Sequence, residues 1–529
     1  MLGTSILVSL ASLLVSLISF ANQLVLAGLF GASMSMDAYL IAGSIPMLLA
    51  GVLSAALSYS LVPALISHKS DFISYRRFSG LLLIGLVVVS TIIATAGFVT
   101  TPSQIEMLGS SLSRAAEQDA ILIARVSWIT MGFTVVVGHL TAMHLAVRRF
   151  LLPVFASMLP VIAMILAGLI YAPTYGPRAV AWGLLIGVLL SIPVLLRYTF
   201  QSIDFSVRCL LLWKDVSGYL FRSPMIILAM LCFTAFQSID AYWAPQVGIG
   251  NLAYLGYSQR ILVAIGGLVI AGPAAVLLPR LAQAYAEGRI ADLLHDTGRT
   301  VRTVIAVALP VAVYISLLAA PLVRLLFERG EFDRQATQGV AGVLPLMMTG
   351  MIGMLCVVIV FRALFSKHDI GRASMLGILA TALYFVLSGL LSQQSGVKGI
   401  ALAYASSWWL VLLLSGLSLW RGYMGMLFCR QNLVFAGKLA VLAGATSFVV
   451  AGGRLWIGES DLGVGLLTLK LSIVAALAAI VYLTVALRVL RIDEIRLLFT
   501  FLSAKFAFLT PRRTKAEPNR EVSIINARD

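Results

Sequence analysis

Apolar runs long enough to cross a lipid bilayer recur along almost the whole chain, separated by short polar gaps. A spanning helix needs about 20 apolar residues, because the bilayer cannot satisfy backbone hydrogen bonds and the helix must close its own. The pattern therefore predicts an all-α polytopic membrane protein with about fourteen transmembrane helices. The expected spans are 4–30, 37–65, 78–100, 120–146, 150–172, 179–197, 218–246, 252–279, 301–326, 336–365, 372–393, 398–420, 432–453 and 462–488.

Lys and Arg concentrate in every second gap between these spans, which predicts the orientation of the chain. One odd-numbered gap departs from the alternation, because Arg324, Arg329 and Arg334 cluster there among acidic residues. Cytoplasmic loops carry the excess of positive charge, so we expect cytoplasmic amino and carboxyl termini. The basic gaps follow the even-numbered spans and hold Lys69, Arg76, Arg77, Arg148, Arg149, Arg197, Arg208, Lys214, Arg280, Arg289, Arg299, Arg302, Lys367, Arg372, Arg421, Arg430 and Lys438.

Composition agrees with this assignment, since 60% of the 529 residues are hydrophobic and 11% are charged. The formal net charge of +16 does not indicate a nucleic-acid partner, because the basic residues lie scattered between apolar runs and form no single stripe. The four cysteines have no CxxC spacing, so the sequence predicts neither a zinc site nor a redox motif.

An internal repeat appears at an offset of about 216 residues. This offset spans six predicted helices, an even number, so the two copies have the same orientation and are parallel repeats. We expect four parts: a first lobe at 1–200, a second lobe at 215–425, a separate helix pair at 430–490 and a basic cytoplasmic tail at 491–529. The matching segments are 38–40 with 253–255, 62–65 with 278–281, 156–159 with 373–376, and 176–181 with 396–401.

Two motifs carry a resemblance to a known family. Residues 30–32 (FGA) precede 37–39 (DAY), and residues 326–333 read LFERGEFD. With these motifs the chain resembles the MurJ/MviN family of lipid II flippases, in a superfamily that also contains polysaccharide flippases and multidrug antiporters. The resemblance implies fourteen helices, two lobes, alternating access, and a groove in the last two helices that receives a lipid tail.

The chain departs from the family pattern at several cationic positions. Relatives carry arginines in the first helix and a basic pair in the second, which bind the pyrophosphate of the cargo. The matching positions here are Ser16, Asn22, Ala50 and Gly51. This difference favours an undecaprenyl-pyrophosphate-linked glycan of the exopolysaccharide or O-antigen type over the peptidoglycan precursor lipid II.

Charges inside a bilayer cost at least about 2.5–3.5 kcal/mol each, so each one needs a partner, a cavity or a function. Arg260 stays at a family position, where it would bind the cargo phosphates or pair with Asp240. Asp37 matches a family motif but would also cap a helix. Arg125 and Arg362 would line the path or snorkel to the interface.

The amides of Asn22 and Gln23 would suit sugar hydroxyls or join helices. His139 and His144 would take part in proton coupling or in hydrogen bonds between helices. The expected substrate-binding set is Arg260, Asp37, Asn22, Gln23, Arg125, Asp240 and Arg362.

The leading hypothesis is a flippase of the inner membrane, and two alternatives remain open. A multidrug or cation antiporter of the same superfamily would have twelve helices, and a glycan polymerase or ligase would have a large extracytoplasmic loop with an acid–base pair. No cofactor or metal is expected, and the membrane potential or an ion gradient would drive transport. The expected partners are the lipid-linked glycan, membrane lipids and proteins of glycan synthesis.

Overall fold

The computed structural model describes residues 2–67, 72–200, 203, 228, 231–232, 234–366, 369–418, 430–458, 463–492 and 494–496. Every regular element in these ranges is helical, which confirms the predicted all-α class. The helices are α1 (Leu2–Phe30), α2 (Met34–Ser67), α3 (Phe72–Leu108), α4 (Arg114–Ala146), α5 (Leu151–Ala156), α6 (Met158–Tyr175), α7 (Arg178–Thr199), α10 (Phe236–Val247), α11 (Asn251–Ala286), α12 (Ile290–Leu317), α13 (Ala319–Phe327), α14 (Arg334–Ser366), α15 (Ile370–Ser395), α16 (Val397–Ser418), α18 (Arg430–Ile457) and α19 (Val464–Thr484), which a π-turn at Val485–Val489 extends.

Thirteen helical segments of the described residues are long and apolar enough to cross a membrane. The predicted seventh span, 218–246, lies mostly outside the described residues, and α10 forms its end. The outward faces are strongly apolar, as a lipid contact requires; on α18, Phe448 is 83% exposed and Leu455 is 84% exposed. The polytopic membrane fold is therefore confirmed.

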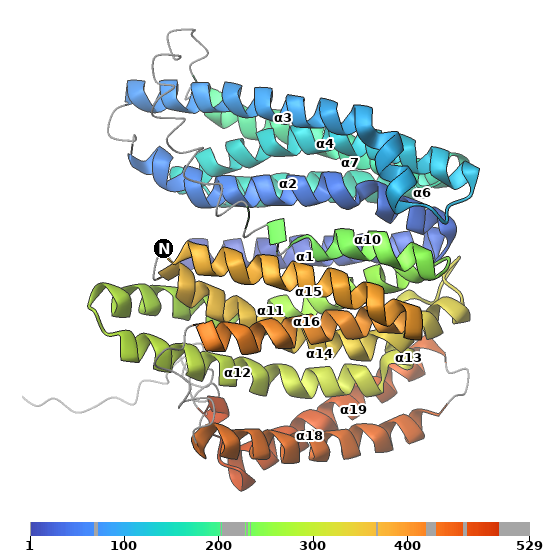
Figure 1. Ribbon diagram of the computed structural model, residues 1–529, viewed down its shortest axis with the longest axis vertical. Coiled ribbons are helices and arrows are strands. Elements are labelled where there is room, and N and C mark those ends of the chain that lie inside the picture. Colours follow the sequence, from blue (N-terminus) through green and yellow to red (C-terminus); the bar gives the residue numbers. More distant parts are fainter. Residues whose placement is uncertain are drawn as a thin grey trace, which may run out of the picture.

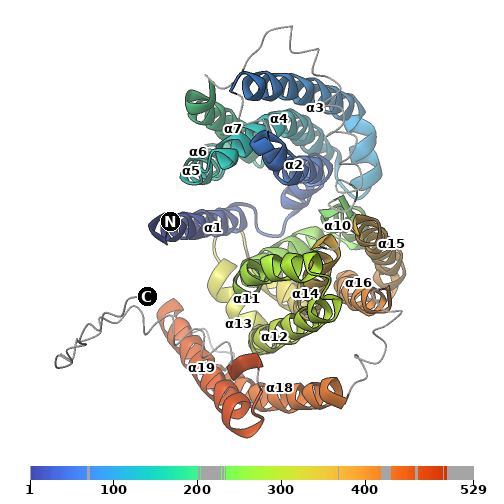
Figure 2. The same cartoon turned by 90° about the vertical axis from the view of Figure 1, so that its left-hand side faces the viewer.

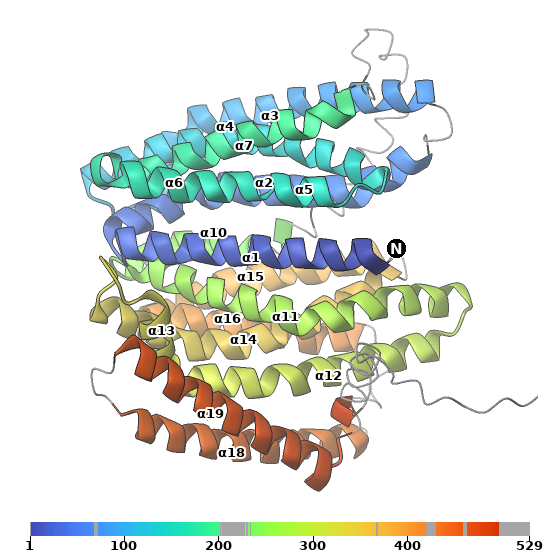
Figure 3. The same ribbon diagram turned by 180° about the vertical axis from the view of Figure 1, so that it is seen from behind.

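The helices run side by side along one direction and form two sets (Figure 1). Helices α2–α7 make up one set and α10–α16 the other, with α1 between them (Figure 2). Helices α18 and α19 lie at the outer edge beside α12 and α13 (Figure 3). We propose that the two sets correspond to the lobes that the sequence predicts at 1–200 and 215–425, with α18 and α19 as the separate pair.

Equivalent helix ends in the two sets have the same backbone conformation. Gly176 ends α6 with φ 57° and ψ −146°, and Gly396 ends α15 with φ 60° and ψ −141°. Each glycine donates its N–H to the carbonyl four residues earlier, Ala172 or Ser392. A positive φ is the region that glycine adopts without a steric penalty. This shared geometry agrees with the repeat of 176–181 and 396–401.

Two spans predicted as continuous helices are broken, and a proline explains each break. Pro160 has no N–H for the carbonyl of Ala156, and the Ser191 hydroxyl of α7 donates to that oxygen at 2.9 Å; the predicted span 150–172 therefore divides into α5 and α6. Pro321 likewise has no N–H for Leu317, and the span 301–326 divides at Leu318 into α12 and α13.

Separate apolar cores hold the two sets together. One core, around Phe78, Trp128 and Leu140, lies within the first set. The larger core extends from α10–α16 through the adjacent ends of α1 and α2 to the neighbouring parts of α3, α4, α6 and α7, so it also joins the two sets. Smaller clusters and two tyrosines dock the outer pair: Tyr314 donates to the Leu471 carbonyl at 2.9 Å, and Tyr482 donates to the Ala306 carbonyl.

Candidate functional site

Asp37 caps a helix of the opposite set and not its own helix α2. Its carboxylate accepts hydrogen bonds from the backbone N–H of Gly250 at 2.6 Å and of Ala253 at 2.9 Å, at the start of α11. Asp37 is only 2% exposed. A helix N-terminus presents unpaired N–H groups and a partial positive charge, so an anion there is strongly favoured. A cap of its own helix, which the sequence suggested, is therefore replaced by a cap of α11 that joins the two sets.

The two family motifs meet beside this cap. Glu331 donates its backbone N–H to the Gly28 carbonyl at 2.9 Å, and Tyr257 donates its hydroxyl to the Gly31 carbonyl at 2.7 Å. A Cβ on Gly330 would lie 2.2 Å from the Gly28 oxygen, so the backbones are in close contact.

Aromatic packing closes the same end of the molecule. The Tyr257 ring lies 5.3 Å from Phe327 and 5.2 Å from Phe332, and both phenylalanines are fully buried. We call this assembly the end clasp. It consists of residues 28–37, 250–257 and 326–333.

Arg260 lies on α11 between the two sets. It is about 15 Å along the axis from Gly250, at roughly 1.5 Å per residue. The protein surrounds the guanidinium closely, with Tyr39 of α2 nearby, yet part of the side chain has an exposed surface. Arg260 is thus a charged side chain on a membrane-spanning helix that is only partly covered by the protein.

The predicted ion pair of Arg260 with Asp240 is absent from the described part of the chain. Asp240 is instead 8% exposed and accepts a hydrogen bond from the Tyr384 hydroxyl of α15. Phe236 stacks on Tyr384 at 4.5 Å and encloses this carboxylate in an aromatic cluster. The side chain of Asp240 is therefore directed into the second set, toward α15.

Asn22 and Gln23 differ in environment although they are neighbours in α1. Asn22 is 3% exposed, and its side-chain oxygen has no hydrogen-bond partner among the described residues. A buried polar atom without a hydrogen bond costs free energy, so the Asn22 side-chain oxygen is available to accept a hydrogen bond from a ligand. Gln23 is half-buried and has an amide that water can reach.

The two remaining arginines of the predicted set have different surroundings. Arg125 of α4 is half-buried with its guanidinium 5.0 Å from the centre of the Phe98 ring, a cation–π contact within the first set. Arg362 is half-buried near the opposite end of α14 from Arg334. The structure therefore does not gather the seven predicted residues into one cluster.

The histidines are buried. His144 makes the predicted contact between helices, with Nε2 3.1 Å from the Leu195 carbonyl of α7. His139 is fully buried on the same helix.

At the positions where the family resemblance implies cations, the side chains are small. Ser16 is exposed and donates to its own helix, at the Ser12 carbonyl. Ala50 is buried, whereas Gly51 is exposed with no atom within 4 Å of an added Cβ. A long side chain would fit at Gly51.

Several residues of the site were missed by sequence analysis. Tyr39 lies inside the quoted 37–39 motif, so a signal was available for it. Tyr384 gives no such signal, because its hydroxyl reaches Asp240 only through the folding of distant helices.

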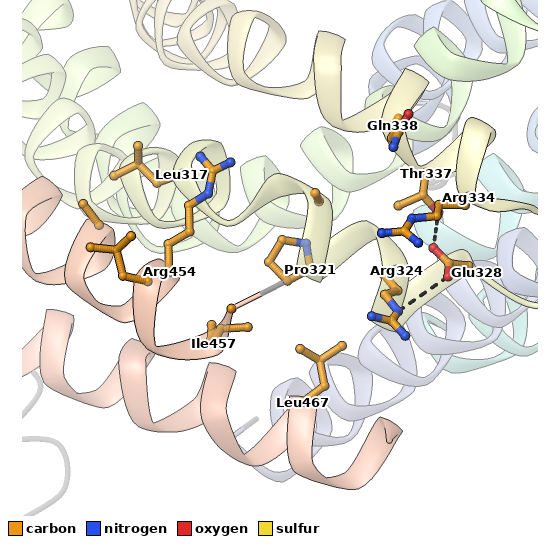
Figure 4. Close-up of a pocket in the computed structure, with 14 residues that line it drawn as sticks. Leu317, Pro321, Arg324, Glu328, Arg334, Thr337, Gln338, Arg454, Ile457 and Leu467 are labelled. Carbon is orange, nitrogen blue, oxygen red and sulfur yellow. Dashed lines mark hydrogen bonds and ion pairs between the residues drawn. The ribbon is translucent and has the colours of Figure 1, made fainter. Parts of the chain in front are cut away.

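A second feature lies at the clasp end, between the second set and the outer helix pair. It is a pocket of about 710 Å³ between α12–α14 and α18–α19 (Figure 4). Apolar side chains form most of its wall, and charged residues from α13, α14 and α18 project into it.

Comparison with known proteins connects this geometry to a family. A family model described as "Lipid II flippase MurJ" matches residues 26–467. "Probable lipid II flippase MurJ" of Vibrio cholerae serotype O1 is 26% identical over 479 residues, covering 86% of this chain and 89% of that protein. The Haemophilus influenzae protein of the same description is 27% identical over 474 residues, covering 84% and 90%.

Solved structures agree on the fold. The lipid II flippase MurJ in an inward closed conformation superposes with a TM-score of 0.75 at 16% identity, covering 91% of this chain and 99% of that one. An inward-facing multidrug MATE transporter of the MOP superfamily gives 0.66 at 14% identity, covering 81% and 94%. Since the match of the family model extends from residue 26 to residue 467, the chain belongs to the lipid II flippase MurJ family of membrane transporters.

Proposed function

We propose that this protein flips an undecaprenyl-pyrophosphate-linked glycan across the inner membrane by alternating access between its two sets of helices. Relatives described as lipid II flippases support a lipid-linked cargo. The observation that carries the proposal is Arg260, a cation on a membrane-spanning helix that has an exposed surface and no carboxylate partner among the described residues.

Arg260 suits a pyrophosphate for physical reasons. A guanidinium stays charged and presents a fork of donors that matches phosphate oxygens. In surroundings of lower dielectric than water, its attraction for an anion is stronger than at the surface. Asp240 forms no ion pair with this cation and accepts a hydrogen bond from Tyr384 instead.

The end clasp supports the alternating-access part of the proposal. Its hydrogen bonds join the first set to the second at one end, through Asp37 and the 326–333 loop. Release of the cargo at that end requires these contacts to break. The excess of Lys and Arg in alternate loops supports an extracytoplasmic clasp and cytoplasmic termini.

We further propose that the cargo differs from lipid II, in the way an exopolysaccharide or O-antigen repeat does. Ser16, Asn22, Ala50 and Gly51 supply no positive charge where the resemblance implies four cationic side chains. The uncharged Asn22 and Gln23 amides would serve sugar hydroxyls instead.

The test replaces Arg260 with Lys and with Gln and measures glycan export normalised to membrane abundance. Lys keeps the charge but loses the fork, and Gln loses the charge. A phosphate-binding role therefore predicts export that falls in the order Arg, Lys, Gln, with normal abundance for all three proteins.

Asp240→Asn is the matched control. Since Asp240 does not pair with Arg260, this change is expected neither to restore export in Arg260→Gln nor to alter its abundance. Normal export by well-expressed Arg260→Gln would refute the proposal, and rescue of a poorly expressed Arg260→Gln by Asp240→Asn would show an ion pair instead.

A further inference from the structure

The pocket between the second set and the outer helices combines apolar walls with unneutralised cations. Leu317, Pro321 and Leu467 belong to its apolar lining, on α12, α13 and α19 (Figure 4). Its volume, about 710 Å³, falls within the roughly 300–1,000 Å³ of ordinary ligand sites. It can therefore accept part of an amphiphilic molecule.

Three arginines and one glutamate supply the charges of this lining. Glu328 is already engaged: it lies 3.5 Å from Arg324 and accepts a hydrogen bond from the Thr337 hydroxyl at 2.7 Å. Arg334 and Arg454 are exposed and form no ion pair with any residue that the structure describes. The pocket thus keeps two guanidinium groups that can serve an anion.

The lining of the pocket includes part of the outward apolar face of α18. Leu455, which lines it, is 84% exposed, and the adjacent Trp456 is 52% exposed. Tryptophan at a helix end is typical of the level of lipid headgroups. Arginines beside an apolar surface at this depth match a phosphate above hydrocarbon chains.

The pocket is separate from the proposed cargo site. Its lining comes from α12, α13, α14, α18, α19 and the single residues that follow α13 and α18, and includes no residue of α1, α2 or α11. Arg260 and Tyr39 lie on α11 and α2. An occupant would therefore enter from the surrounding bilayer and not from the space between the two sets.

We propose that this pocket binds the phosphate headgroup of an anionic glycerophospholipid of the extracytoplasmic leaflet, held by Arg334 and Arg454. The acyl chains lie against the exposed apolar faces of α18 and α19. The lipid fills the space between the second set and the outer pair and holds the pair in place. This proposal depends on the orientation of the chain and not on which glycan is transported.

The experiment is native mass spectrometry of the purified full-length protein with added phosphatidylglycerol or phosphatidylethanolamine. The wild type is expected to retain phosphatidylglycerol preferentially. The double variant Arg334→Gln/Arg454→Gln is expected to lose that preference by a factor on the order of ten or more, since each cation near the surface contributes to the attraction. A double lysine variant, which keeps both charges, is expected to retain most of it and controls for folding.

Arg114→Gln is the matched control, because Arg114 is an exposed arginine at the same end of the bundle, outside the pocket. It should leave lipid retention unchanged. Equal retention of both lipids by the wild type, or equal loss with Arg114→Gln, would overturn the proposal. Displacement of phosphatidylglycerol by inorganic phosphate would show a free-anion site, and displacement by equimolar undecaprenyl phosphate would assign the pocket to the cargo lipid; either result also overturns it.

Discussion

At the scale of single residues, the backbone conformation of Gly330 and Gly31 explains why the clasp motifs contain glycine at these positions. Both have positive φ values, 58° and 54°. A Cβ on Gly31 would lie 2.2 Å from the Glu331 oxygen, and one on Gly330 equally close to the Gly28 oxygen. The glycines therefore permit a backbone contact between α1 and the 326–333 loop that no other residue allows.

We predict that Gly330→Ala destabilises the protein by about 1–2 kcal/mol from its left-handed φ alone, with a further cost from the clash. Thermal unfolding of the protein in detergent measures the loss. Gly51→Ala is the control: it lies in a helix with open space around it, so its unfolding temperature should be equal or slightly higher. A Gly330→Ala protein as stable as the wild type would contradict the assigned contact.

The role of a single residue was predictable from the sequence where it depends on neighbouring residues in the chain. The position of Asp37 at the start of the second span suggested a cap of that helix; its carboxylate caps α11 instead, which the sequence gives no means of seeing. The Arg260–Asp240 pair was wrong because opposite charges on neighbouring helices do not reveal the direction of each side chain. Tyr384, which decides the environment of Asp240, lies 144 positions away.

At the scale of elements, polar contacts complement the apolar packing of the outer helix pair. Arg302 of α12 donates to Glu494 at 2.7 Å and to the Asn432 side chain of α18 at 3.0 Å. One arginine thus joins α12, α18 and the segment after α19. Both charged side chains are largely buried, at 24% and 13% exposed, so solvent screens the pair only in part.

We predict that Arg302 and Glu494 are coupled by about 0.5–3 kcal/mol in a double-mutant cycle with Arg302→Gln and Glu494→Gln. Removing either partner leaves the other charge unpaired. The double variant should therefore lose less stability than the sum of the losses in the two single variants. Thermal unfolding of the four proteins gives the coupling. Purely additive effects would mean that the contact does not hold the segment.

Helix existence was predicted well, and helix continuity was not. Long apolar runs force a spanning helix, because no other structure satisfies the backbone in lipid. The breaks at Ser157 and Leu318 depend on Pro160 and Pro321, which are visible in the sequence. However, prolines also occur within unbroken helices here, such as Pro345 in α14, so the residue alone does not decide.

For the whole molecule, the chain is a multi-pass inner-membrane transporter, and the proposed alternating access requires the clasp to open. We predict that Asp37→Asn shifts the protein toward opening at the clasp end. The amide keeps one acceptor oxygen and loses the charge, and a hydrogen bond to a charged group contributes about 1.5–3 kcal/mol. Labelling of Ala32→Cys by a membrane-impermeant maleimide, in a chain without its natural cysteines, should become faster.

Asp119→Asn is the control for that labelling. It removes the contact with Arg178 at the same end, but within the first set, so the labelling rate should not change. Equal acceleration by both variants would indicate general loosening. Labelling from the cytoplasmic side would contradict the proposed orientation.

The cargo itself is a property of the whole molecule, because it depends on the cations that both sets present. We predict that the unmodified protein does not restore growth to a cell depleted of its lipid II flippase, although it reaches the membrane in normal amount.

Ser16 and Gly51 are exposed, and Gly51 has open space, so Ser16→Arg/Gly51→Arg can introduce two cations without displacing packed atoms. If missing charge is what excludes lipid II, this double variant should restore growth in part, and Ser16→Gln/Gly51→Gln, of similar polarity but neutral, should not. Full rescue by the unmodified protein would show that Arg260 alone suffices for the pyrophosphate of lipid II.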